Sequence, residues 1–232
     1  MSIEGGHDAY SVAQDQFWGS VHSKLADLHE KYACERYNSA ASLVDLPNTR
    51  VPRLNEVSNT LTRLTGFELT AAEAATSGRD FFCAFADGIF HASTGLRPAD
   101  SPDYTSEPDL VHDLIGHAAI LGDPLIAQLY RSFGKAASRT ESDTEFTRIA
   151  SLFWFTMETG LIIENGGVRA YGAAVLSSAT EMRSFDNAEH RTFDVADILS
   201  QQINDKTCQS FYYVAESFEH IETEVRSCLD RF

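Results

Sequence analysis

Apolar residues recur at three- and four-residue intervals along most of the chain, which is the spacing of amphipathic helices. The spacing predicts helices over 17–32, 54–64, 71–85, 121–137, 145–163 and 215–229. Shorter apolar runs favour strands at 88–92, 167–171 and 211–214. Gly66 is placed to end the second helix, and Asn165-Gly166 to turn the chain before the second strand. The pattern therefore predicts a mainly α fold with a small β component, as a single domain over 1–232.

One further helix carries two histidines that are five residues apart. Glu107 and Pro108 suit its first turn, and Gly116 is a natural place for it to end. On a regular α-helix, residues at this separation point about 140° away from each other, which suits a shared metal ion poorly. We therefore expect His112 to lie on the helix and His117 just past its end, with the glycine permitting the break.

Glu158 is the one ionisable residue in the apolar run LFWFTMETG, 152–160. Burying an unpaired carboxylate costs several kcal/mol, so this residue needs a partner. A divalent metal shared with His112 and His117 would satisfy all three groups. Two imidazoles and one carboxylate form the facial triad of non-haem Fe(II) oxygenases. A histidine pair alone is more often structural or exposed, so the acid is what favours a metal.

Composition narrows the class of protein. The formal charge of −16 argues against binding nucleic acid or an anionic membrane surface. No apolar stretch reaches the roughly 18 residues of a membrane span, and the first residues do not form a secretory signal. The four cysteines are far apart with no CxxC pair, which favours reduced thiols. We expect a soluble, cytoplasmic enzyme.

Four segments carry a resemblance that goes beyond spacing: EPDLVHDLIGH, FWFTMETGL, RAYGAAVLSS and FYYVAESF. Together they resemble the pterin-dependent aromatic amino acid hydroxylases, the family of phenylalanine, tyrosine and tryptophan hydroxylases. The resemblance implies an iron(II) monooxygenase that uses tetrahydrobiopterin, or a related tetrahydropterin, with O₂ as co-substrate. It implies a catalytic domain without the regulatory domain and tetramerisation helix of animal members, hence a monomer or small oligomer.

The resemblance assigns roles residue by residue. The iron ligands fall on His112, His117 and Glu158. Residues implied to bind the substrate or orient a ligand are Arg97, Thr105, Trp154 and Ser177, with Glu181 just beyond. Residues implied to meet the pterin are Phe81, Thr76, Gly78, His91 and Asp113. Considered singly, an arginine is commonly a solvated loop charge, and a tryptophan or phenylalanine is commonly core; the chemistry of Arg97 nevertheless suits a bidentate carboxylate.

Departures from the family pattern bear on the substrate. Thr159 stands where phenylalanine is usual, Ala174 where glycine is usual, and the segment 203–210 differs from the family's loop. We expect Thr159 and Ala174 to line the substrate pocket and to displace the ring, so that hydroxylation falls away from the para carbon, at the meta carbon. Phenylalanine is the favoured substrate.

Other functions stay open at this point. Tyrosine or tryptophan could replace phenylalanine as the substrate. A zinc metallohydrolase is a different class, although the sequence has no HExxH motif. A non-catalytic binding module is a third class, and loss of a metal ligand or of Arg97 would indicate it. None of these residues has been lost.

Overall fold

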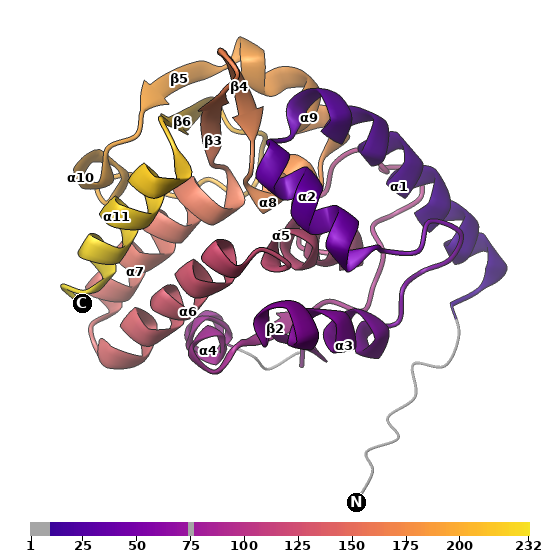
Figure 1. The fold of residues 1–232 in the computed structure, drawn as a ribbon, viewed down its shortest axis with the longest axis horizontal. Helices are drawn as coiled ribbons and strands as arrows, with labels where there is room; N and C mark the ends of the chain where they lie inside the picture. Colours follow the sequence, from indigo (N-terminus) through magenta and orange to yellow (C-terminus); the bar gives the residue numbers. More distant parts are fainter. Residues whose placement is uncertain (1–9, 74–76) are drawn as a thin grey trace, which may run out of the picture.

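Helices make up most of the part of the chain that the computed structural model describes, residues 10–73 and 77–232 (Figure 1). The α-helices are α1 (Val12–Tyr32), α2 (Glu35–Val44), α3 (Leu54–Thr65), α4 (Gly78–Ala84), α5 (Ala119–Leu121), α6 (Pro124–Arg139), α7 (Asp143–Phe153), α8 (Ala173–Leu176), α9 (Ala179–Ser184), α10 (Val195–Ile198) and α11 (Phe218–Leu229). Two π-helices, η2 (His112–Ala118) and η3 (Trp154–Glu158), and two 3₁₀ turns, η1 (Phe85–Asp87) and η4 (Phe185–Asn187), complete the helical part. The expected fold class, mainly α with a small β component, is confirmed.

Strands form one small sheet and one separate pair. The sheet has the order β4-β3-β6-β5, and its strands are β3 (Leu161–Glu164), β4 (Gly167–Ala170), β5 (Glu189–Thr192) and β6 (Phe211–Ala215). β3 and β4 are antiparallel, and both Asn165 and Gly166 between them have positive φ, as a tight hairpin turn requires. β1 (Glu68–Ala71) pairs in parallel with β2 (Ile89–Ala92). The expected turn at Asn165-Gly166 is therefore confirmed, although it joins two strands and not a helix and a strand.

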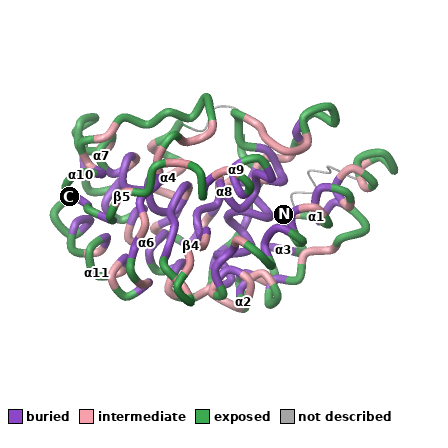
Figure 2. Tube along the Cα trace, turned by 90° about the horizontal axis from the view of Figure 1, so that it is seen from above, coloured by how far each residue is buried: buried purple, intermediate pink, exposed green. Residues whose placement is uncertain are grey.

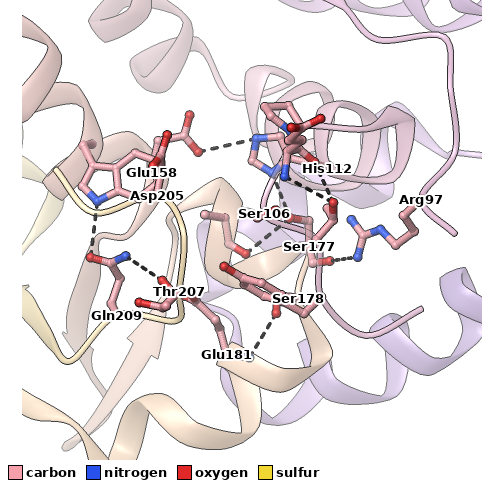
Figure 3. Close-up of a pocket in the computed structure, with 16 residues that line it drawn as sticks. Arg97, Ser106, His112, Glu158, Ser177, Ser178, Glu181, Asp205, Thr207 and Gln209 are labelled. Atoms are coloured by element: carbon pink, nitrogen blue, oxygen red, sulfur yellow. Dashed lines mark hydrogen bonds and ion pairs between the residues drawn. The ribbon is translucent and has the colours of Figure 1, made fainter. Parts of the chain in front are cut away.

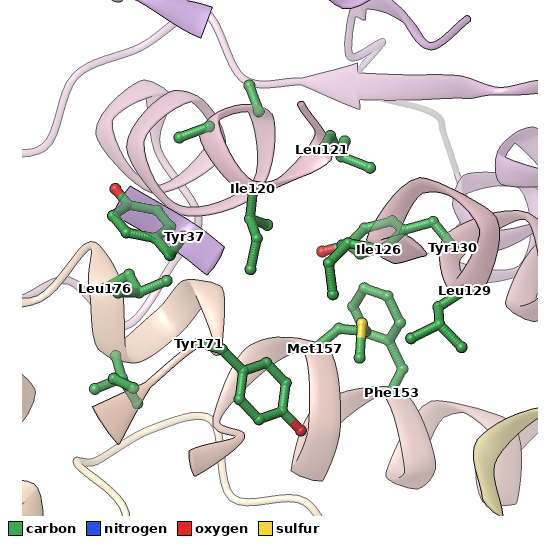
Figure 4. Close-up of a cluster of buried hydrophobic side chains, with 14 of the residues drawn as sticks. Tyr37, Ile120, Leu121, Ile126, Leu129, Tyr130, Phe153, Met157, Tyr171 and Leu176 are labelled. Carbon is green, nitrogen blue, oxygen red and sulfur yellow. The ribbon is translucent and has the colours of Figure 1, made fainter. Parts of the chain in front are cut away.

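The core lies between the helices in the middle of the molecule and the four-stranded sheet at one end (Figures 1 and 2). Side chains from α5, α6, α7 and η3 meet there with Tyr171, which follows β4 (Figure 4). Each fully buried large apolar side chain contributes about 1.5–3 kcal/mol relative to exposure. This packing holds η2 and η3, the two helices that carry the candidate metal ligands.

Two of the helices that begin later than expected follow a strand. The helix expected over 71–85 starts at Gly78, where the Ser77 side chain accepts from the Asp80 amide, and Ala71 belongs to β1. Similarly, the helix expected from 215 starts at Phe218, because Ala215 is still paired within β6. In both cases apolar periodicity was overridden by a neighbouring strand pairing.

The helix expected over 145–163 is wrong in its last third. α7 passes into η3, which ends at Glu158, and β3 follows from Leu161. Strand pairing explains the change, because Leu161 and Ile162 lie between β4 and β6 in the sheet. Branched residues such as Ile162 and Ile163 suit a pleated strand better than a helix.

Candidate metal centre and substrate cavity

A π-helix, and not a helix end, brings the two histidines together. η2 runs through His117, and the Ala119 amide donates to the Leu114 carbonyl, five residues back. This wider turn suits the i, i+5 separation, and the Nε2 atoms of His112 and His117 are 2.9 Å apart. The expected helix break at Gly116 is therefore wrong. The glycine is needed for packing instead, because a Cβ there would lie 2.7 Å from the Ala173 carbonyl oxygen.

Glu158 completes the group from the end of the second π-helix, η3. Its Oε1 lies 3.2 Å from His117 Nε2, and its Oε2 lies 3.6 Å from His112 Nε2. Adjacent ligands on one octahedral ion with bonds near 2.1 Å would be roughly 3 Å apart, so the three donor atoms fit one face of such an ion. Among the residues described, Glu158 Oε2 is buried without a hydrogen-bond partner. A cation would satisfy it.

The electrostatics of the three groups are coupled. Burial acts to raise the pKa of Glu158, but the charges of His117 and His112 outweigh it and leave that pKa lowered. Burial also acts to lower the pKa of His117, while the adjacent Glu158 carboxylate leaves it raised. The pKa of His112 is lowered, by burial and by the neighbouring His117. A negative carboxylate between two imidazoles is the charge arrangement that a divalent cation needs.

A hydroxyl group contacts the Nδ1 atom of each histidine and orients its ring. Ser177 Oγ lies 3.0 Å from His112 Nδ1 and is placed to donate to the Ala174 carbonyl, so it can accept from the ring and leave Nε2 free as a metal donor. The Tyr130 hydroxyl lies 2.7 Å from His117 Nδ1. Sequence analysis anticipated the serine and missed the tyrosine. Its only signal was a tyrosine on an apolar helix face, which needs a polar partner when buried.

Asp113 is a second carboxylate beside the histidines, with ligand atoms of the three residues within 4.8 Å of one another. However, its Oδ2 already accepts from the Ser93 amide at 2.6 Å. Glu158 instead has an unpaired oxygen and lies nearer both Nε2 atoms. The geometry therefore favours Glu158 over Asp113 as the candidate third ligand.

A cavity opens beside His112 and Glu158 (Figure 3). Its lining comes from five parts of the chain: Arg97 in the segment after β2, the segment 104–108, the two π-helices, α8 with α9, and the loop before β6. The residues expected at the substrate that do line it are Arg97, Thr105, Trp154, Ala174 and Ser177. Lining residues that sequence analysis did not place at the substrate are Tyr104, Ser106, Glu107, Pro108, Ser178, Asp205, Thr207 and Gln209. The last three belong to the segment 203–210, whose departure from the family pattern was the only signal.

Arg97 lines the cavity but is 4% exposed and already paired. Its Nε and NH2 groups donate to the two carboxylate oxygens of Asp109 at 3.1 and 2.7 Å, and NH1 donates to the Ser177 carbonyl at 2.9 Å. The bidentate edge expected to hold a substrate carboxylate is thus held by Asp109. A substrate carboxylate can use only the remaining NH2 hydrogen and the guanidinium charge. Asp109 was not identified from the sequence.

Thr159 does not line the cavity, so that expectation is wrong. The residue is 1% exposed, and its hydroxyl donates to the Trp154 carbonyl at 2.9 Å. The expectation assumed that the helix predicted over 145–163 continues past Glu158, whereas η3 ends there. Trp154 does line the cavity, and its indole donates to Gln209 Oε1 at 3.3 Å. Thr159 therefore contacts the backbone of Trp154 and not the cavity.

Four of the five residues expected to meet the pterin lie outside this cavity lining, on the side of η2 near β2 and α4: Gly78, Phe81, His91 and Asp113. The ring of Phe81 packs edge-on against Phe90, with centroids 5.4 Å apart, and Phe90 lies 4.9 Å from the His117 ring. His91 Nδ1 lies 2.7 Å from Thr70 Oγ1. Gly78 opens α4, Asp113 is held by Ser93, and Thr76 lies outside the described residues. Only the ring of Phe90 thus lies between Phe81 and His117.

A mainly helical fold that places two imidazoles and a carboxylate together beside a cavity is typical of mononuclear non-haem metal enzymes. Comparison with known proteins identifies the family: the chain belongs to the biopterin-dependent aromatic amino acid hydroxylases, whose pattern matches residues 7–232. In the described residues, no helix is both long and apolar enough to span a bilayer.

The chain is similar to several named enzymes of this family. The chain is 39% identical to the tyrosine 3-monooxygenase of Drosophila melanogaster over 94% of its own length, but spans only 38% of that relative. It is 34% identical to the phenylalanine 3-hydroxylase of Streptomyces coeruleorubidus, covering 95% of this chain and 79% of the relative. The crystal structure of Chromobacterium violaceum phenylalanine hydroxylase, which holds iron(III) and 7,8-dihydrobiopterin, matches with a TM-score of 0.88 at 28% identity, over 96% of this chain and 82% of that one.

Proposed function

We propose that this chain binds one Fe(II) ion and uses a tetrahydropterin and O₂ to hydroxylate the ring of an aromatic amino acid. The observation that carries the proposal is the position of His112, His117 and Glu158, whose donor atoms lie 2.9–3.6 Å apart beside the cavity. When bound, iron and pterin would supply the oxidising chemistry. The protein would supply position, charge and exclusion of water.

The residues of the chain divide this work. Ser177 and Tyr130 would hold the imidazoles of His112 and His117 in one tautomer and orientation. The guanidinium of Arg97, fixed by Asp109, would attract the substrate carboxylate at one end of the cavity. Trp154 would present an apolar face to the substrate ring. A ring fixed at both ends exposes one carbon to the metal centre, and a displacement of about 1 Å would change which one.

For the substrate we propose phenylalanine, with hydroxylation at the meta carbon. Support comes from the Streptomyces relative, which is named for position 3 of phenylalanine and which the chain covers over most of its length. Tyrosine is the second candidate, because the Drosophila relative acts at position 3 of tyrosine by name. A phenylalanine-4-hydroxylase from Dictyostelium discoideum is 34% identical, so the para carbon is the competing position.

The test is anaerobic reconstitution with Fe(II), followed by O₂, tetrahydrobiopterin and phenylalanine, tyrosine or tryptophan in separate reactions. We expect phenylalanine to give mainly 3-hydroxyphenylalanine by chromatography against standards. Exclusive formation of para-tyrosine would overturn the meta assignment, and no turnover of any amino acid by iron-loaded protein would overturn the activity. His117→Ala tests the metal site by removing a candidate ligand. Its control is His190→Ala, which removes a histidine that contacts the Phe185 carbonyl.

A further inference from the structure

Where the π-helix η2 ends, the hydrogen-bond pattern skips one of its own carbonyl groups. The Ala119 amide donates to Leu114, five residues back, and α-helical spacing resumes at Ala119. At that spacing the next amide, of Ile120, reaches Gly116. By this spacing, the carbonyl of Ile115 lies between these two acceptors and is left without a helical donor. A buried carbonyl in this position needs a partner from elsewhere.

Tyr37, on α2, supplies that partner. Its hydroxyl donates to the Ile115 carbonyl at 2.8 Å, across 78 residues of sequence. The side chain is 1% exposed, and burial raises the pKa of Tyr37, so the phenol stays protonated as a donor. The connection therefore runs from the N-terminal helices to the turn between the two metal-binding histidines.

His29, on α1, holds the tyrosine in place. Its ring packs edge-on against Tyr37 with centroids 4.7 Å apart, and its Nε2 lies 2.7 Å from the Leu176 carbonyl. Burial lowers the pKa of His29 to about 4, so the ring is neutral near pH 7 and donates from Nε2. Leu176 directly precedes Ser177, which contacts His112. The pair thus contacts η2 itself and the residue that precedes Ser177.

We infer that Tyr37, held by His29, is a positioning residue for the metal centre, because its hydroxyl favours the π-helical form of η2 that sets His112 beside His117. The inference rests on the proposed function. In an ordinary α-helix the Ala119 amide would bond to the Ile115 carbonyl, and the two histidines would point about 140° apart. Only the π-helical form leaves this carbonyl needing Tyr37. Removing the hydroxyl therefore penalises the π form and not the α form.

The chain offers a matched control for this hydroxyl. Tyr171 is also 1% exposed, and among the described residues its hydroxyl has no hydrogen-bond partner. Tyr37→Phe and Tyr171→Phe delete the same atom from equally buried rings, but only the first leaves a carbonyl unpaired. Anaerobic titration with Co(II), at a temperature well below the unfolding midpoints of both variants, separates metal affinity from fold stability. The visible spectrum of bound Co(II) reports the ligand geometry.

We expect Tyr37→Phe to weaken Co(II) binding about 10-fold or more and to alter the spectrum, as loss of groups that orient ligands typically does, with Tyr171→Phe like the wild type. Equal affinities and spectra for the two variants would overturn the inference. If Tyr37→Phe does not fold, His29→Gln takes its place; it keeps a donor for Leu176 but frees the tyrosine, and unchanged Co(II) affinity would again overturn it. Tight Co(II) binding by His117→Ala would instead overturn the proposed function, whatever Tyr37 does.

Discussion

The π-helix η2 and the loop 203–210 border the same cavity but are built in opposite ways. Residues 113–120 are all buried, and η2 receives side-chain contacts from Ser177, Tyr130 and Tyr37, each on a different element. The loop is largely exposed, and its hydrogen bonds are mostly internal, such as Gln209 to the Asn204 carbonyl at 2.8 Å. The candidate metal ligands are thus fixed by tertiary contacts, whereas the part of the cavity wall formed by the loop can vary at little cost to the fold.

The largest expected effect tests the ligand side of this comparison. Glu158→Ala should abolish tight iron binding and turnover, because two imidazoles alone leave one of the three ligand positions on that face of the ion unfilled. Asp113→Asn should retain iron, since that carboxylate is already bonded to the Ser93 amide. Iron content after anaerobic loading and desalting measures both. Full occupancy in Glu158→Ala, with loss in Asp113→Asn, would show that the carboxylate assignment is reversed.

A second effect of similar origin concerns Asp109. Asp109→Asn leaves the Arg97 guanidinium buried without its anion, which typically costs about 3–5 kcal/mol. We expect a lower midpoint of urea unfolding and a raised KM for the amino acid, with the KM for pterin changing less. Arg191→Gln, which breaks an exposed pair with Glu189, is the control. If both variants unfold at the same urea concentration, the buried pair does not stabilise the cavity wall.

His29 predicts a pH dependence of stability. Its pKa is about 4 in the folded protein, and is lowered by burial, against 6.5 when unfolded. The unfolded state therefore binds the proton first: the contribution is full above pH 6.5 and is lost as the pH falls towards 4, by roughly 3 kcal/mol. His29→Gln should lose less stability over this window, by urea unfolding at pH 7 and pH 4.5. Parallel losses in wild type and variant would contradict it.

The pterin side is expected to respond more weakly. Phe81→Ala should weaken tetrahydropterin binding tenfold or less, since aromatic stacking is worth about 0.5–1.5 kcal/mol, and should leave iron in place. Phe82→Ala is the matched control, because that ring packs against Phe146 and Phe153. Isothermal titration of the iron-loaded protein separates the two. Equal pterin affinity in both variants would place Phe81 in the core alone.

The smallest expected change is in product distribution. Asp205→Asn alters the charge of the cavity wall, so we expect a shift in amino acid preference or product ratio of about 1 kcal/mol or less, with constant iron content. Thr159→Phe should mainly overpack the buried space behind Trp154 and lower stability by about 1–3 kcal/mol. Product analysis and thermal unfolding of both variants test this division. Altered products from Thr159→Phe with an unchanged melting temperature would show instead that Thr159 helps to set selectivity.

The sequence by itself determined the ligand types and the mainly helical fold. Apolar spacing identifies helices wherever one face packs on the core, and α3 ends at Gly66 as expected. A lone acid in an apolar run pointed to Glu158 because a buried charge requires a partner. The segment 203–210 was notable only as a departure, and its residues Asp205, Thr207 and Gln209 line the cavity.

Only the tertiary structure decided how these groups meet. The i, i+5 histidines converge through a π-helix, whose passed-over carbonyl is bonded by Tyr37 from another helix. Likewise, the fork of Arg97 is held by Asp109, and Thr159 turns away because η3 ends one residue earlier. Local sequence cannot specify these outcomes, since each depends on a hydrogen bond or packing contact between segments that are distant in the chain or on where a helix stops.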